Sequence, residues 1–321
     1  MLSKGSEKVR SSAFSRRRRP ERLKSLLQTF SLPWLNMIDW LLQSAAEHPD
    51  LARGVPSPGV FSSAELLRLE QFRFDKRRSE WLLGRWTAKQ LLRSHLRDQY
   101  AFDAPLDALL VGREPGGAPV AILDSQQALN AGWPMDAVET LPLIGAAGEQ
   151  PAGPALTVVG VRLPVSLSIS HSNGAAFCAL LRTNGATAHL QLGADIERID
   201  TRSQQFRTTF LTATENAWIS SATADLADML VTATWSVKEA VLKALQLGLT
   251  VDTRRVTALC RFDGDLTQWT PVQIECDSLL IPRRNVNGGV TTPVAHQLTG
   301  WWRTADAYVL SMAALEMAVP R

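Results

Sequence analysis

Apolar residues recur at helical spacing in several segments of the chain. A short helix is predicted after residue 62, because Ser62 and Glu65 form a capping box ahead of apolar residues at helical spacing. A second capping box, Thr212 and Glu215, precedes another such region. Longer helical patterns cover residues 77–96 and 224–246.

Other segments have the composition and alternation of β-strands, namely residues 109–112, 166–170, 175–181, 186–197, 256–262, 272–276, 297–302 and 308–312. Helices and strands are mixed, with antiparallel hairpins toward each end, which predicts an α+β fold. Between residues 120 and 164 the pattern weakens. Residues 145–154 contain eight Gly, Ala or Pro, which indicates a flexible insertion.

Two helical segments resemble each other at a distance of 149 residues: Trp86-Thr-Ala-Lys-Gln and Trp235-Ser-Val-Lys-Glu. We therefore predict two similar halves with a site between them. The N-terminal half would cover residues 37–190, including the flexible insertion at about 120–164. The C-terminal half would cover residues 191–321.

Charge is unevenly distributed along the chain. Residues 1–24 carry nine Lys or Arg and two Glu, a net +7, so the remainder is −4 although the whole chain is +3. We expect residues 1–36 to form a basic, disordered tail, or to precede a true start at Met37. The run Arg16–Arg19 could contact nucleic acid or anionic lipid. A solvated tail is the favoured interpretation, and no nucleic-acid partner is expected.

The composition indicates a folded protein without secretory or membrane features. Hydrophobic residues make up 45% of the chain, enough for a substantial core. Three cysteines without paired spacing (Cys178, Cys260 and Cys276) predict buried thiols in a reducing, cytoplasmic setting. Polar residues interrupt the apolar segment 26–42, which is too short to span a bilayer and lacks the pattern of a signal peptide.

Asp195 and Glu197 end a predicted strand in the run Gly-Ala-Asp-Ile-Glu. Residues two apart on a strand share a face, so both carboxylates point the same way. Neighbouring carboxylates raise one another's pKa unless a cation lies between them. Oxygen ligands combined with substrate phosphates suit magnesium. A strand end with solvated acids is the alternative, and this pair alone does not decide between the two.

A second group of charged residues lies on the helix predicted over residues 224–246. Glu239 and Lys243 are four residues apart and share a face, with Lys238 adjacent. Glu239 could complete the carboxylate set while the lysines neutralise phosphate oxygens. A surface Glu–Lys pair is the alternative.

A third group stands at the end of the strand predicted over residues 166–170. Ser170 and His171 could bind a phosphate through a hydroxyl, an imidazole and backbone N–H groups. Solvated polar side chains are the alternative. A Ser–His nucleophile is disfavoured, because adjacent strand residues point to opposite faces and no nucleophile elbow is present.

In combination these motifs resemble the Sfp-type 4′-phosphopantetheinyl transferases. The runs Gly193–Glu197, Trp235–Lys243 and Ser168–Ser172 match that family in order and spacing, over roughly residues 60–321 without the insertion. The resemblance implies two α+β halves related by a pseudo-twofold, with coenzyme A bound between them. It also implies magnesium-dependent transfer of 4′-phosphopantetheine from coenzyme A to a serine of an apo acyl or peptidyl carrier protein, releasing 3′,5′-ADP. We expect a monomer.

Site residues carry over from the family by motif. Asp195, Glu197 and Glu239 would be magnesium ligands, and Glu239 and Lys243 would be catalytic. The role of Glu239 as ligand, base or both stays open. Contacts to coenzyme A would come from Lys76, Arg85, Arg113, Ser170, His171 and Lys238. The carrier-facing surface could include Phe206, Arg207 and Phe210, with a core role for both phenylalanines as the alternative.

This chain departs from the family pattern at one position. Where the family often has a lysine, this chain has Ala118, and Arg113 could compensate for the missing phosphate contact.

The alternative function is a non-catalytic protein that binds coenzyme A or a carrier on the same scaffold. An unrelated magnesium nucleotidyl or phosphoryl transferase is disfavoured, because no Gly-x-x-x-x-Gly-Lys-[Ser/Thr] loop is present. The carrier's pathway, whether fatty acid, polyketide or nonribosomal peptide synthesis, stays open.

Overall fold

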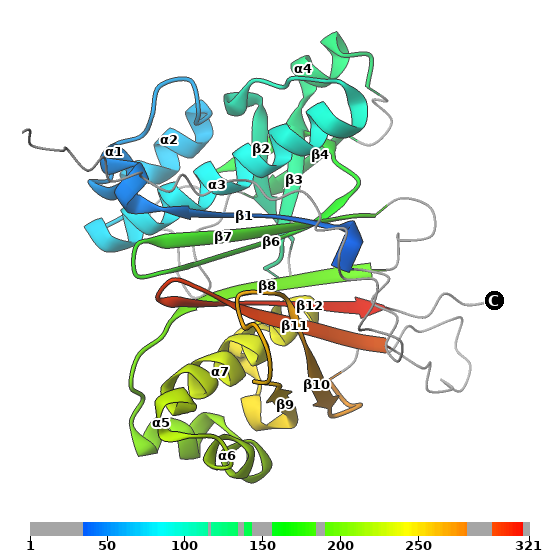
Figure 1. Cartoon of the computed structure of the whole chain (residues 1–321). Helices are drawn as coiled ribbons and strands as arrows, with labels where there is room; N and C mark the ends of the chain where they lie inside the picture. Colours follow the sequence, from blue (N-terminus) through cyan, green and yellow to red (C-terminus); the bar gives the residue numbers. More distant parts are fainter. Residues whose placement is uncertain are drawn as a thin grey trace, which may run out of the picture.

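A computed structural model describes residues 35–114, 117–133, 138–142, 156–183, 190–280 and 297–316. It shows the predicted α+β fold, with helices and strands in two main groups (Figure 1). The expected basic tail, apart from residues 35 and 36, lies outside the described residues. So does the Gly/Ala/Pro-rich segment 145–154.

In the first group, the long helix α3 (Asp75–Tyr100) covers one face of a three-stranded antiparallel sheet. Its strands lie in the order β1 (Ile38–Ser44), β7 (Ala175–Arg182) and β6 (Val165–Ser172). Two short helices, α1 (Pro49–Ala52) and α2 (Ser63–Glu70), precede α3. The sequence patterns did not predict β1, because an exposed Asp39 interrupts its apolar run.

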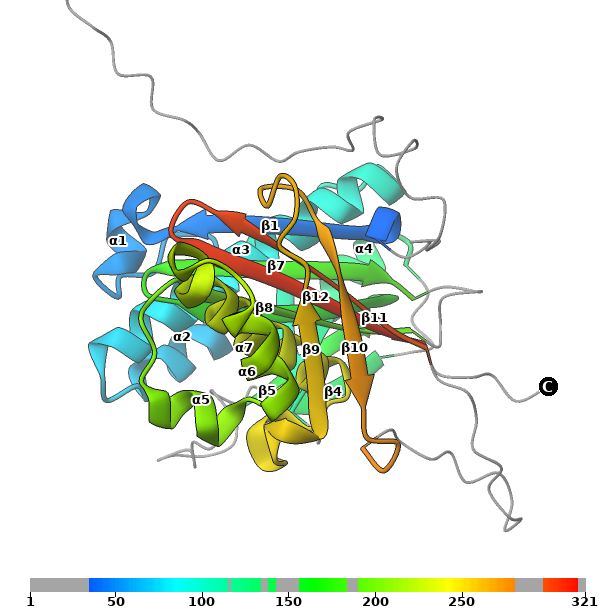
Figure 2. The ribbon, with the colours of Figure 1, turned by 60° about the horizontal axis from the view of Figure 1, so that its bottom comes forward.

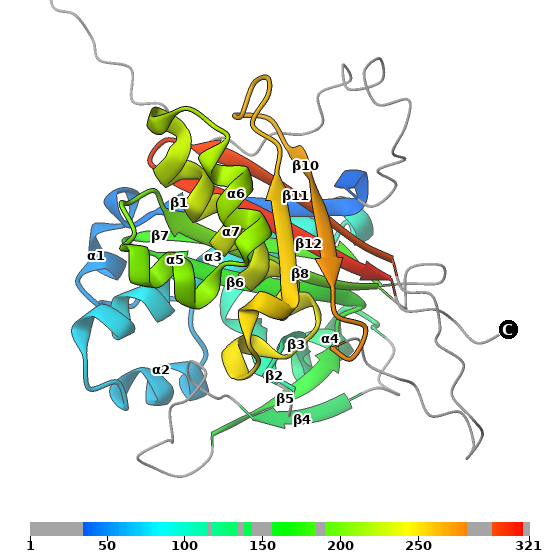
Figure 3. The ribbon, with the colours of Figure 1, turned by 90° about the horizontal axis from the view of Figure 1, so that it is seen from below.

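In the second group, helix α7 (Ala227–Ala244) packs on a five-stranded antiparallel sheet. The strand order is β8 (Leu190–Arg198), β12 (Tyr308–Glu316), β11 (Gln297–Ala305), β10 (Thr270–Cys276) and β9 (Val256–Cys260). Helices α5 (Gln204–Phe210) and α6 (Ala213–Ser220) precede α7. They lie on the same side of this sheet as α7, away from α3 (Figure 3).

The two sheets face each other, with α3 and α7 on the outside (Figures 1 and 2). Alternate residues of β7, β8 and β12 form one buried cluster between the sheets, which includes Phe177, Ala179, Ala194, Ile196, Leu310 and Met312. The intervening residues of each strand point toward the helix of their own group. Asp195 and Glu197 therefore face α7, because Ala194 and Ile196 face the other sheet.

A row of serines on β6 joins the two groups. Their hydroxyls accept hydrogen bonds from backbone N–H groups of β8, and each bonded pair is 26 residues apart: Leu192 to Ser166 (3.1 Å), Ala194 to Ser168 (2.8 Å) and Arg198 to Ser172 (3.4 Å). The constant separation shows that β6 and β8 run parallel. The alternation of serines in the sequence thus supplies side-chain partners for the backbone of β8, an edge strand of its sheet.

Part of the expected insertion is regular structure. A four-stranded sheet has the order β2 (Leu109–Arg113), β3 (Pro119–Asp124), β5 (Thr157–Arg162) and β4 (Val138–Pro142), with helix α4 (Ser125–Asn130) after β3. The expectation of a flexible insertion at about 120–164 is wrong for β3, α4, β4 and β5, whereas β2 contains the strand predicted at residues 109–112. Val120, Ile122 and Val158 instead pack with Leu110 in a small core of their own.

Each main group contains the same buried ion pair. The carboxylate of the α2 capping box, Glu65, binds Lys89 of α3 at 2.5 Å, and that of the α6 capping box, Glu215, binds Lys238 of α7 at 2.7 Å. Each lysine also donates to a backbone carbonyl two residues before the capping box, Lys89 to Val60 and Lys238 to Phe210, both at 2.8 Å. Both predicted capping boxes are confirmed. The repeated contacts support the likeness of the two halves, whereas their pseudo-twofold relation and their limits at residues 37, 190 and 321 stay predictions.

Candidate active site

Asp195 lies buried on β8, surrounded by hydrogen-bond donors from α7 and β6. Its Oδ1 accepts from Lys243 Nζ at 2.6 Å and from Ser170 Oγ at 2.7 Å. Its Oδ2 accepts from Ser236 Oγ at 2.8 Å. Lys243 also donates to Ser170 Oγ at 3.0 Å, which closes a small network around the carboxylate.

The absence of a side chain at Gly193 allows this network to form. A Cβ at that position would overlap the carbonyl oxygen of Ala240 on α7. Any other residue would push α7 away from β8 and separate Lys243 from Asp195.

Glu197, two residues further along β8, points to the same side. Its Oε1 accepts from Trp235 Nε1 at 3.1 Å, and its Oε2 from Arg202 Nη2 at 3.1 Å. Ser172 Oγ lies 3.5 Å from Oε2. Burial, followed by the charge of Asp195, raises the pKa of Glu197 above its usual range.

Glu239 lies on α7, one turn after Trp235 and one turn before Lys243. Burial raises its pKa to about 7, and the negative charge of Asp195 adds to this effect. Lys243 acts in the opposite direction on Glu239. Burial also lowers the pKa of Lys243, but the negative charges of Asp195 and Glu239 outweigh this, and its pKa lies above the usual value.

The donor set suits a divalent cation, but the side chains are not arranged as ligands. Three carboxylates face one region, and the pKa values of Glu197 and Glu239 are raised, which a bound cation would relieve. No group of three or more His, Cys, Asp or Glu in the described part of the chain is placed to hold a metal ion. Asp195 and Glu197 instead accept the hydrogen bonds described above.

Ser170 and His171 approach this region from β6. Ser170 is buried against Asp195, whereas the His171 side chain is 38% exposed. His171 Nδ1 lies 3.7 Å from Glu80 Oε2 on α3. Lys76, one turn earlier on α3, lies 3.9 Å from Glu80 with its side chain 74% exposed. Lys76 and His171 thus both approach Glu80, near the N-terminal end of α3.

Arg85 carries a buried guanidinium with an unmet hydrogen-bond need. Its Nε is buried without a hydrogen-bond partner among the described residues. Burial lowers the pKa of Arg85 to about 10, and the positive charges of Arg113 and Arg68 also lower it, while Glu65 raises it. A concentration of buried positive charge with an unused donor suits an anion.

Lys238 requires a correction. Its side chain is fully buried, and Nζ is occupied by Glu215 and by the carbonyl of Phe210. It therefore cannot reach a ligand, and the expectation that Lys238 contacts coenzyme A is replaced by a structural role. Phe206 and Phe210 are half-buried and pack against Trp235, Phe206 edge-to-face and Phe210 at a tilt, while Arg207 donates to Asn216.

Sequence reasoning missed several residues that hold the carboxylates. Ser236 and Trp235 belong to the recognised helical motif, and their helical spacing from Glu239 and Lys243 could have identified them. Arg202 lies in the segment between β8 and α5, where no periodicity marks it. Only the path of the folded chain brings Arg202 next to Glu197.

Part of the second half of the chain matches the model of a known protein family. Residues 191–277, which include Asp195, Glu197, Glu239 and Lys243, match the model of the 4′-phosphopantetheinyl transferase superfamily. No curated protein matches the chain.

Two solved structures illustrate the matches among known folds. The holo-[acyl-carrier-protein] synthase (AcpS) of Thermotoga maritima is 14% identical with a TM-score of 0.27, over 40% of this chain and 63% of that chain, less than two thirds of its length. The apo-ACPS of Chronobacterium ammoiniagenes is 20% identical with a TM-score of 0.29, over 45% of this chain and 95% of that chain. Separately, none of the helices in the described ranges is long and apolar enough to cross a membrane.

Proposed function

We propose that the chain is an Sfp-type 4′-phosphopantetheinyl transferase. It would use magnesium to transfer 4′-phosphopantetheine from coenzyme A to a serine of an apo acyl or peptidyl carrier protein. The observation that carries the proposal is the position of the family match. It covers the strand and the helix whose side chains, Asp195 and Lys243, form the charged network facing Ser170 and His171.

The two groups of charged residues divide the substrate between them. Arg85 and Arg113, with Lys76 at the exposed end of α3, would bind the phosphates at the nucleotide end of coenzyme A. His171 would bind a phosphate oxygen through Nε2, because Nδ1 faces Glu80. Lys243 would transfer its hydrogen bonds from Asp195 to the pyrophosphate.

The reaction is a displacement at phosphorus. The serine oxygen of the carrier forms a bond to the phosphorus that bears pantetheine, the bond from this phosphorus to the bridging oxygen breaks, and 3′,5′-ADP leaves. Glu239, with a pKa of about 7, is suited to accept the serine proton near neutral pH. Lys243 would stabilise the charge that develops on the leaving phosphate.

Magnesium would be held by Asp195, Glu197 and Glu239, and would supply charge neutralisation on the pyrophosphate. Glu239 must be deprotonated either to bind magnesium or to accept the serine proton, and its role as ligand, base or both stays open. Phe206 and Phe210, half-buried beside Trp235, offer an apolar contact for the carrier.

Mass spectrometry of apo carrier proteins tests this function directly. The full chain is incubated with coenzyme A, magnesium and a panel of apo carriers from fatty acid, polyketide and nonribosomal peptide synthesis. We expect one carrier to gain the mass of one phosphopantetheine, and Asp195→Asn to abolish the gain. Binding of coenzyme A without any mass gain across the panel would instead support a non-catalytic binding protein.

A further inference from the structure

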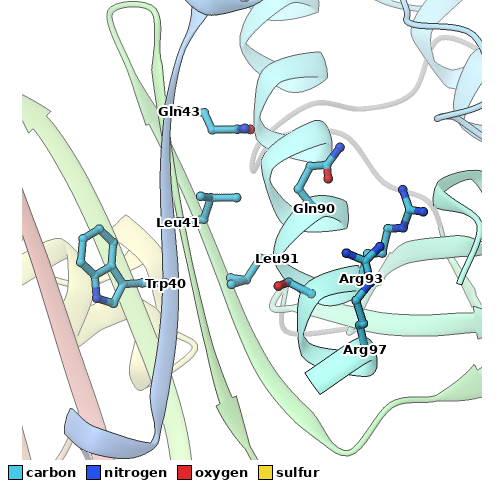
Figure 4. Close-up of a pocket in the computed structure, with 8 residues that line it drawn as sticks. Trp40, Leu41, Gln43, Gln90, Leu91, Arg93 and Arg97 are labelled. Carbon is cyan, nitrogen blue, oxygen red and sulfur yellow. The ribbon is translucent and has the colours of Figure 1, made fainter. Parts of the chain in front are cut away.

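A pocket of about 290 Å³ lies between β1 and α3, apart from the candidate active site (Figure 4). Two leucines line it, together with Trp40, Gln43, Gln90, Arg93, Ser94 and Arg97. None of the described lining residues is acidic. Nothing in the proposed transfer reaction uses this pocket.

The pocket occupies, in the first half, the position that the candidate active site has in the second. Thr87 on α3 donates to Gln43 Oε1 of β1 at 3.1 Å, as Ser236 on α7 donates to Asp195 Oδ2 of β8 at 2.8 Å. Thr87 and Ser236 are 149 residues apart, the separation that also relates the buried lysines of the two helices. Gln43 therefore corresponds to Asp195.

The same separation identifies two further counterparts along the helices. Gln90 corresponds to Glu239, and Ser94 corresponds to Lys243. Amides thus replace two of the carboxylates, and a hydroxyl replaces the lysine. A pocket without carboxylates has no ligand set for magnesium, because magnesium binds through carboxylate and phosphate oxygens.

The remaining polar groups can each donate a hydrogen bond. Thr87 Oγ1 lies 2.8 Å from the carbonyl oxygen of Leu83 and 3.1 Å from Gln43 Oε1, so its one proton has two acceptors. The amide of Gln43 can therefore donate to a ligand through its NH₂ group. Arg93 binds Asp103 through Nε and Nη2 at 2.6 and 2.9 Å, and Arg97 binds the same carboxylate through Nη2 at 2.6 Å. Two guanidiniums share one carboxylate, so the group formed by Arg93, Arg97 and Asp103 has a net charge of +1.

We propose that this pocket binds a phosphate group, free or carried by a small organic molecule, without magnesium. The amide donors and the hydroxyl would hold its oxygens, and the excess charge of the Arg93–Arg97–Asp103 group would balance its charge. The first half would thus keep an anion site where the second half has a metal-dependent one. This inference does not depend on transfer activity.

The test follows the side-chain NH₂ signals of Gln43 and Gln90 by NMR in the full chain with EDTA present. Gln43→Leu and Gln90→Leu assign the signals. Inorganic phosphate is titrated in one arm and glycerol 3-phosphate in the other, and we expect saturable shifts with a Kd on the order of millimolar. The arm with the lower Kd identifies free or esterified phosphate as the better ligand.

Two variants locate the bound phosphate, and one serves as a control. Arg97→Gln should weaken binding about tenfold, because the Arg93–Arg97–Asp103 group then loses its net positive charge. Arg254→Gln is the matched control, because its side chain is also 53% exposed and also pairs with an aspartate. Asp195→Asn should leave the shifts unchanged. Absence of saturable shifts, equal binding by Arg97→Gln, or loss of binding in Asp195→Asn would each overturn the proposal.

Discussion

Lys243 Nζ lies 2.6 Å from Asp195 Oδ1, so a lysine of α7 balances a carboxylate of β8. Glu197 and Glu239 add two more negative charges to this region, and Arg202 adds one positive charge. When all three carboxylates are ionised, the cluster therefore has one uncompensated negative charge. From this charge balance we predict different effects for replacing Lys243 and for replacing Glu239.

Replacing Lys243 with Met should make the chain more dependent on magnesium. The variant leaves three carboxylates facing Arg202 alone, so their repulsion lowers the stability of the metal-free protein. We expect the melting temperature to rise more on magnesium addition in Lys243→Met than in wild type, while transfer falls at least about 100-fold. Arg53→Met, at an exposed surface pair, is the control. Equal magnesium shifts in all three proteins would show that Lys243 does not compensate the carboxylates.

Glu239 should make the metal-free protein less stable as pH rises. Its pKa is about 7 in the folded chain and near 4.3 in an unfolded one. Between these values the folded state binds more protons, so the free energy of unfolding falls with increasing pH. Glu239→Gln removes this dependence. In urea unfolding with EDTA, we expect the free energy of unfolding of the variant to exceed that of wild type by about 3–4 kcal/mol at pH 8, with the difference narrowing toward pH 5. A difference that does not vary with pH would contradict the raised pKa.

The sequence indicated which residues share one face of a strand or helix. It indicated less well which of these faces pack against each other in the fold. Strand alternation correctly placed Asp195 and Glu197 together, and helical spacing placed Glu239 with Lys243. Lys238 was misassigned because it was judged by adjacency to Glu239. Neighbouring helical residues point about 100° apart, and Lys238 turns into the core.

Contacts between distant segments were not predictable from local patterns. The alternating serines of β6 were visible, but their bonding to β8 depends on a parallel pairing that no short-range rule provides. The strands β3 and β5 were missed because their partners form a separate small sheet. Arg202 has no periodic neighbour, so only the folded chain relates it to Glu197.

Loss of Lys238 should destabilise the fold rather than weaken ligand binding directly. In Lys238→Met, Glu215 keeps its bonds from the N–H groups of Thr212 and Ala258 but loses its buried counter-ion. We expect a loss of about 3–5 kcal/mol in the free energy of unfolding, measured with urea. Lys89→Met should also show a large loss, because Glu65 would likewise lose its buried counter-ion. A loss no larger than that caused by Arg254→Gln, which removes an exposed ion pair, would contradict the structural role.

The serine row on β6 should stabilise β8 through its backbone. In Ser168→Ala, the buried N–H of Ala194 loses its acceptor, which costs about 1–3 kcal/mol. Hydrogen exchange measured by NMR should show faster exchange at the Ala194 amide, with smaller effects at Leu192. Ser220→Ala, which removes an exposed hydroxyl bonded within its own helix, should leave both amides unchanged. Unaltered exchange at Ala194 in Ser168→Ala would mean that the N–H has another partner.

Glu80 should control the charge of His171. Burial lowers the pKa of His171, Glu80 raises it, and Lys243 lowers it while Asp195 raises it. Glu80→Gln removes the closest carboxylate, so we expect the pKa of His171 to fall further, as followed by NMR of the imidazole during a pH titration. Because only the imidazolium adds a positive charge toward a phosphate, affinity for coenzyme A should fall as pH rises through the His171 pKa. In the variant this fall should begin at lower pH. Glu70→Gln, at an exposed residue of α2, is the control. An unchanged titration of His171 in Glu80→Gln would show that the 3.7 Å approach has no electrostatic effect.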